Sequence, residues 1–177
     1  MTDFKRFIEE ENHKAEQKFE FDPVKRIQWF NSQVADLYNK IDNEWLKEYI
    51  SYGGIITDIK PIKIFEEALG EYDSLAKCIK IGNNILNIVP VGTIILGTKA
   101  RIDMTFHGKS VMMVLVGEKI EYASQMIDIY INSRPSRKRQ DPGKPVWKFA
   151  SHDKLTELVE ITTFSFQKQI MDLMKDS

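Results

Sequence analysis

The sequence predicts an α+β domain: an antiparallel sheet of about six strands, with two helices before it and one helix after it. Apolar residues recur every three or four positions at both ends of the chain, and they alternate with polar residues in the middle. Strands grouped between terminal helices favour an antiparallel sheet covered by helices over a parallel fold. We therefore expect a single domain, 1–177, with a helical part (1–52), a sheet (55–150) and a C-terminal helix (151–175).

The two N-terminal helices are predicted from apolar spacing and from their end signals. Apolar residues at helical spacing over 3–20 predict the first helix. Asp22 then provides a capping side chain, and Pro23 suits the first helical position, where its missing N–H costs nothing. An apolar stripe over 24–45 predicts the second helix, and Gly53-Gly54 predicts its end.

The sheet is predicted to begin at Ile55, where the apolar period changes to two. Pro61 interrupts the strand expected over 55–64, and because proline cannot donate to the ladder, it predicts an edge strand or a bulge. Residues 65–70 fit either a strand end or one helical turn.

Two hairpins are predicted in the middle of the chain, because residues that tolerate positive φ separate pairs of β-rich runs. The first hairpin joins 77–81 to 85–89, and the second joins 101–106 to 111–116 through His107-Gly108-Lys109. In the second, Ile102, Met104 and Phe106 alternate with Arg101, Asp103 and Thr105, which predicts one buried and one polar face.

The remaining elements are predicted less specifically. An apolar run over 91–97 suits a segment buried on both sides. Further strands are expected at 126–131 and 146–149, separated by a loop over 133–145, and Ser151 or Asp153 is expected to cap the final helix.

Composition excludes several classes of protein. Hydrophobic residues make up 42% of the chain, which is enough for a core, and the lone Cys78 excludes an internal disulfide or a cysteine-rich zinc site. No apolar run approaches the ~20 residues needed to cross a bilayer, and the N-terminal residues lack the apolar stretch of a secretory signal. We therefore expect a cytoplasmic protein with no membrane partner.

The most distinctive local feature is a basic loop from Arg134 to Lys144. It stands out because the charges of the whole chain nearly cancel, with Lys+Arg 25 and Asp+Glu 26. Its cations suit phosphates or an acidic protein surface, and Trp147 adds a stacking surface or belongs to the core. The alternative is a solvated loop without a partner. The candidate partner-binding residues are Arg134, Arg137, Lys138, Arg139, Lys144 and Trp147.

A loose acidic cluster lies around the turn at Gly70. Glu66, Glu67 and Glu71 are the candidate residues, and they suit a basic partner or form a solvated face.

No catalytic or metal-binding constellation is complete. Metal-dependent nucleases carry an Asp on one strand and Glu-x-Lys on the next, and Asp103 invites this comparison. The comparison fails at the Glu-x-Lys part of the motif, because Glu118 and Lys119 are adjacent and would face opposite sides of a strand. The alternative is that Asp103 pairs with Arg101 or Lys99. We expect no cofactor, because no nucleotide-binding glycine motif is present, and no metal, because the three histidines lack ligand spacing.

These observations favour a non-catalytic, cytoplasmic module that binds another macromolecule, in the manner of an immunity or antitoxin protein, with a protein as the expected partner. Two alternatives remain open. One is a nucleic-acid-associated protein, or a divergent metal-dependent nuclease, that uses the basic loop and Asp103. The other is a sheet domain that binds a small molecule beneath its helices.

Overall fold

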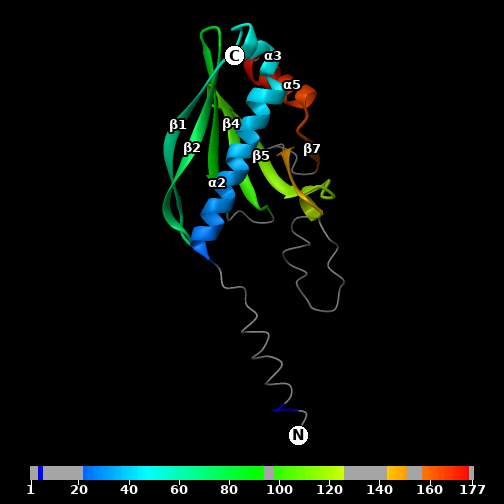
Figure 1. The fold of residues 1–177 in the computed structure, drawn as a ribbon. Helices are drawn as coiled ribbons and strands as arrows, with labels where there is room; N and C mark the ends of the chain where they lie inside the picture. The colour runs from blue at the N-terminus through cyan, green and yellow to red at the C-terminus, as the bar shows by residue number, and fades with distance from the viewer. Residues whose placement is uncertain (1–3, 6–21, 94–97, 126–142, 151–156, 176–177) are drawn as a thin grey trace.

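The fold is a seven-stranded antiparallel sheet with helices packed on one face, seen in a computed structural model (Figure 1). The structure describes residues 4–5, 22–93, 98–125, 143–150 and 157–175. The predicted α+β class and antiparallel sheet are confirmed, although the sheet has seven strands rather than about six.

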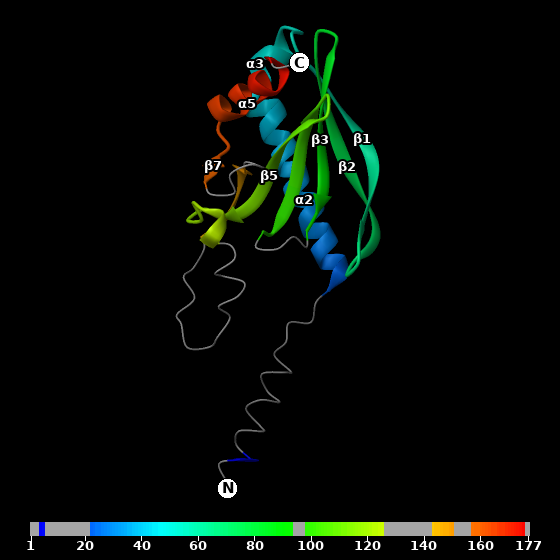
Figure 2. The ribbon, with the colours of Figure 1, turned by 180° about the vertical axis from the view of Figure 1, so that it is seen from behind.

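Each strand of the sheet pairs with its neighbours in the chain, in the order β1-β2-β3-β4-β5-β6-β7. The elements are α2 (Pro23–Lys40), the π-helix η1 (Ile41–Trp45), α3 (Lys47–Ser51), β1 (Ile56–Glu66), β2 (Gly70–Ile81), β3 (Asn84–Gly92), β4 (Ala100–Phe106), β5 (Lys109–Gly117), β6 (Pro145–Ala150), β7 (Leu158–Glu160) and α5 (Thr163–Lys175). Figure 2 shows the sheet from the side opposite to α2, which runs along its far face.

The helix predicted after Asp22 is confirmed, but it is divided into three pieces. The Asp22 carboxylate accepts hydrogen bonds from the backbone N–H groups of Val24 and Lys25, at 3.0 and 3.1 Å, which caps the first turn. The helix then widens into η1, and Leu46, at φ −118°, separates η1 from α3. Gly53 adopts φ 80° and ends the helical region as predicted.

Both predicted hairpins are present, and β4 has the predicted alternation. Ile102, Met104 and Phe106 are buried on the helix-covered face, whereas Arg101, Asp103 and Thr105 are half-buried on the other face. Arg101 donates to both carboxylate oxygens of Asp103, at 2.7 Å each, so the predicted pairing of Asp103 is confirmed.

Strand β2 begins at Gly70, seven residues before the predicted start. The sequence pattern did not indicate its first half, because that half contains weak β-formers such as Asp73 and Ser74. This first half pairs with β1, whereas β2 pairs with β3 only over Lys77–Ile81. The Tyr38 hydroxyl lies 2.8 Å from the Leu75 carbonyl oxygen and 3.2 Å from that of Ile88, where β2 and β3 separate. Burial raises the pKa of Tyr38, so its hydroxyl keeps its proton as a donor.

Strand β1 is an edge strand, as Pro61 predicted, and its open side is blunted. The Ile59 N–H donates to the carboxylate of the preceding Asp58 at 2.8 Å, which occupies one donor that a further strand would need. N–H directions alternate along a strand, so the missing donor of Pro61 falls on the same side as that of Ile59. The centre of the edge therefore offers no free N–H at these two successive outward positions.

A double replacement, Asp58→Ala with Pro61→Val, should restore these donors and make the protein self-associate, because an open edge strand pairs with another edge. Sedimentation equilibrium over a range of concentrations measures this, with the exposed turn residue Glu67→Ala as control. A double variant with the mass distribution of the wild type would show that other features protect the edge.

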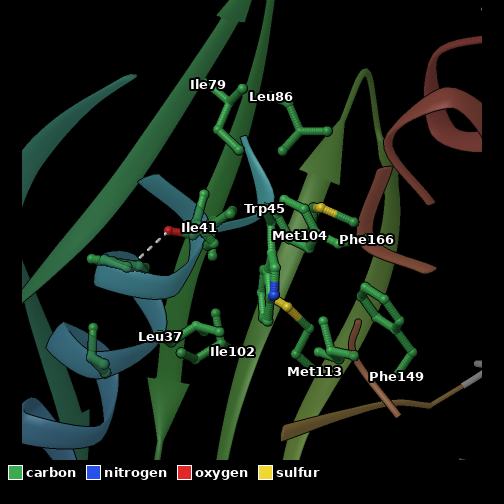
Figure 3. Packing of buried hydrophobic residues seen from close by; sticks show 14 of the residues in the cluster. Leu37, Ile41, Trp45, Ile79, Leu86, Ile102, Met104, Met113, Phe149 and Phe166 are labelled. Atoms are coloured by element: carbon green, nitrogen blue, oxygen red, sulfur yellow. Dashed lines mark hydrogen bonds between the residues drawn. The ribbon is translucent and has the colours of Figure 1, made fainter. Parts of the chain in front are cut away.

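The main core lies between the helices and the sheet, and a smaller cluster covers the opposite face of β5 and β6. In Figure 3, Trp45 of η1 lies in the main core close to Met104 and Met113, with Phe149 and Phe166 beside them. Met112, next to Met113 in the chain, packs against the smaller cluster, so the two methionines face opposite sides of the sheet.

The C-terminal helix begins at Thr163, so the expected start soon after residue 151 was wrong. Leu158–Glu160 form β7 instead, because pairing with β6 buries Leu158 in the smaller cluster. The helix is capped by Thr162 and Ser165, whose side chains bond to each other's backbone N–H at 2.8 and 3.2 Å. The apolar spacing of Leu158 with the later helix produced the error, since a three-residue strand has no period of its own.

Several predicted elements lie outside the described residues: most of the first helix, most of the apolar run over 91–97, the strand at 126–131 and most of the loop over 133–145. In the part of the chain that is described, no helix combines the length and apolarity needed to cross a membrane.

Candidate functional site

The predicted basic loop is described only at its C-terminal end. Arg134, Arg137, Lys138 and Arg139 lie outside the described residues. Lys144 is exposed just before β6, and its carbonyl oxygen accepts a hydrogen bond from the Glu118 N–H at 2.8 Å. Trp147 is half-buried in β6 opposite Leu115 of β5.

The predicted acidic residues lie at the other end of the sheet, around the turn between β1 and β2. Glu67 is exposed in the turn, and Glu71 is exposed and forms an ion pair with Lys63 at 2.8 Å. Glu66 is half-buried at the end of β1. In the strand order β1 and β2 are separated from β6 by three strands, so the acidic residues and Trp147 belong to different surfaces.

Glu66 is the centre of a polar network that joins β1 to β2 and to the end of β3. Its carboxylate accepts from the Tyr72 hydroxyl at 2.5 Å and from the Thr93 N–H at 2.9 Å. Burial raises the pKa of Tyr72, and the bond to Glu66 raises it further. A Cβ at Gly92 would come within 2.8 Å of the Glu66 carboxyl carbon, so the network requires glycine there.

Arg26 of α2 extends this network to the connection between β3 and β4. Its guanidinium donates to the carbonyl oxygens of Thr93 at 2.9 Å and Lys99 at 2.6 Å, and it lies over the Trp29 ring at 4.6 Å. Burial lowers the pKa of Arg26, although not enough to discharge a guanidinium near neutral pH. Since these groups bind one another, the network has the character of a structural clamp.

A groove of about 350 Å³ lies between α2 with η1 on one side and β6 with β7 on the other. Trp147 of β6 lines it, together with Trp45 of η1, which is almost fully buried. Trp45 is held by its ring contact with Phe166, 4.9 Å between centroids, and by the Gln167 side chain, which donates to its carbonyl oxygen at 2.8 Å. The other lining residues are Gln33, Asp36, Leu37, Asn39, Lys40, Glu44, Pro145, Val146, Glu160 and Ile161.

The charged residues of this groove are mostly acidic. Asp36, Glu44 and Glu160 contribute three carboxylates, and Lys40 contributes one ammonium. All four side chains are exposed, and none of the three carboxylates forms an ion pair with a residue that the structure describes. The groove therefore combines a local excess of negative charge with an accessible aromatic ring.

The wall formed by η1 has an unusual backbone. π-Helical turns are rare and occur frequently at functional sites, because the wider turn displaces side chains from their α-helical positions. Here the π-helix contributes Glu44 and Trp45 to the groove, while Asp42 of the same turn faces β2 and pairs with Lys77 at 2.7 Å.

Three other reactive side chains in the described part of the chain each have a neighbour outside the groove. Asp103 is held by Arg101, and His107 stacks on Phe106 with 4.1 Å between ring centroids. Cys78 is a buried free thiol, 3.3 Å from the Asn87 carboxamide oxygen. Over the described ranges, no group of three or more histidine, cysteine or acidic side chains is placed to hold a metal ion.

Comparison with known proteins gives no relative from which a role can be transferred. No protein-family model, curated protein or solved structure matches the chain.

Sequence reasoning identified Trp147 but missed the acidic residues of the groove. Asp36, Lys40 and Glu44 recur at intervals of four on the polar side of the predicted helix, which was a usable signal. Glu160 could not have been added, because its position depends on β7, a strand that the sequence pattern presented as helix.

Proposed function

We propose that this chain is a non-catalytic module that binds another protein, in the manner of an immunity or antitoxin protein. The observation that carries the proposal is the groove between α2 and β6, where Trp147 lies among carboxylates that have no partner in the described part of the chain. Tryptophan is enriched at binding hot spots, and uncompensated surface charge steers association. The free thiol of Cys78 suits a reducing, cytoplasmic setting.

The test is a capture experiment in extract of the source cells, using the wild type, Trp147→Ala and Phe65→Ala. Phe65 is a matched aromatic control, because it is 75% exposed on β1, far from the groove in strand order. A captured protein should form a complex of defined stoichiometry by native mass spectrometry. Its affinity for Trp147→Ala, measured by calorimetry with the purified partner, should be about tenfold or more weaker than for the wild type, since 1.4 kcal/mol of lost contact is tenfold.

The same experiment separates protein binding from nucleic-acid binding. Nuclease treatment of the extract should leave the complex intact if the partner is a protein. Loss of the complex on nuclease treatment, with affinity that falls steeply with salt and with Arg137→Glu and Arg139→Glu, would instead support the nucleic-acid alternative. A protein that remains monomeric and free of any partner in the extract would refute both.

A further inference from the structure

We infer that the groove between α2 and β6 receives a lysine or arginine side chain from a basic segment of the protein partner. This inference rests on the proposed function and specifies the chemistry of the partner. Asp36 and Glu44 lie one helical repeat on either side of Lys40, and Glu160 lies on the facing wall. A cation entering between the walls therefore meets carboxylates on both of them.

Trp147 gives the same groove an aromatic contact for a cation. Guanidinium and ammonium groups bind the faces of tryptophan rings, and arginine does so most often. This chain already uses such contacts internally, since Arg26 lies 4.6 Å from the centroid of Trp29 and Lys77 lies 5.4 Å from that of Tyr38. Carboxylates beside an accessible ring favour a cation over a neutral or anionic group.

The size of the groove indicates how much of the partner enters it. A volume of about 350 Å³ is near the lower limit of ligand pockets, roughly 300–1,000 Å³, so it suits one or two side chains rather than a whole helix or strand. The long, apolar stem of lysine or arginine also matches the apolar lining from Leu37, Val146 and Ile161.

Other routes of binding are less favoured by the geometry. A partner strand added to β1 would meet the blunted positions at Ile59 and Pro61. Phosphate groups would be repelled by Asp36, Glu44 and Glu160, so nucleic acid does not suit this groove. A basic peptide segment satisfies both the charge and the aromatic surface.

The test uses the full chain with hexa-arginine and hexa-lysine peptides as probes, and hexaglutamate and a single-stranded oligonucleotide as negative probes. Binding is followed through the three indole N–H signals in NMR spectra. We expect the basic peptides to shift the Trp147 signal, with little change at Trp29, and we expect affinity to fall with salt. We also expect the triple variant Asp36→Asn, Glu44→Gln, Glu160→Gln to bind the basic peptides at least about tenfold more weakly than the wild type.

A charge-matched control removes three exposed carboxylates elsewhere, Glu48→Gln, Glu67→Gln and Glu121→Gln, and it should keep wild-type affinity. Equal binding by both triple variants, or peptide-induced shifts that avoid Trp147, would overturn the inference. If the captured protein partner still binds the groove variants normally, the inference fails while the proposed function stands. If no partner is captured, the proposed function fails whatever the peptides do.

Discussion

A Phe166→Ala variant is expected to lose about 3–5 kcal/mol of unfolding free energy, the cost of truncating a buried phenylalanine. Phe166 is fully buried, and its ring contacts Trp45 of η1 at 4.9 Å and Phe149 of β6 at 6.5 Å between centroids. One side chain therefore joins the C-terminal helix to the N-terminal helices and to the sheet. Its loss leaves a cavity between all three.

Urea unfolding, followed by circular dichroism and by tryptophan fluorescence, measures this loss. Phe164→Ala is the control, because Phe164 is on the same helix and is 75% exposed, so its truncation should change stability by less than about 0.5 kcal/mol. A loss below about 1 kcal/mol for Phe166→Ala would contradict the packing described for α5.

An Asp42→Ala variant should lose about 3 kcal/mol, because it leaves the ammonium group of Lys77 buried without its partner. Lys77 is only 2% exposed, and its Nζ lies 2.7 Å from Asp42 Oδ2. Among the described residues, Lys77 Nζ also lies 5.4 Å from the centroid of the Tyr38 ring, and this cation–π contact cannot replace a carboxylate. The expected loss of unfolding free energy is at the lower end of the range for buried pairs, because the side chain of Asp42 is 34% exposed.

The converse variant distinguishes a buried charge from simple packing. Lys77→Met fills similar space without a charge. The Asp42 side chain is 34% exposed, although its Oδ1 is buried without a hydrogen-bond partner, so the loss should be smaller than that of Asp42→Ala. The double variant Asp42→Ala, Lys77→Met should be more stable than Asp42→Ala alone. Chemical denaturation of all four proteins gives the coupling free energy, and equal losses in the two single variants would refute the buried-charge explanation.

The elements that the sequence predicted best are those whose signals are local. Asp22-Pro23 determined the start of α2, and His107-Gly108 determined the turn between β4 and β5. The first half of β2 and all of β7 were missed, because their strand conformation depends on pairing with residues elsewhere in the chain. The π-helix was also invisible, since Ile41 and Trp45 fit an ordinary helical stripe.

The candidate site, too, was predicted only where its signal is local in the sequence. The sequence drew attention to Trp147 because it follows a basic loop in the chain. In the structure Trp147 lines a groove together with Asp36 and Glu44, more than a hundred residues earlier. A groove formed by a helix and a strand so far apart in sequence can be located only after the sheet order is known.

The sequential order of the strands has a consequence for how this protein folds. Each strand pairs with its chain neighbour, so most of the sheet can form by closing short loops, which have a small entropic cost. The junction of the C-terminal helix with η1 is different, because there the Gln167 side chain donates to the Trp45 carbonyl oxygen across 122 residues. We expect the hairpins to be native-like in the transition state and this junction to form after it, so that substitutions there accelerate unfolding more than they slow folding.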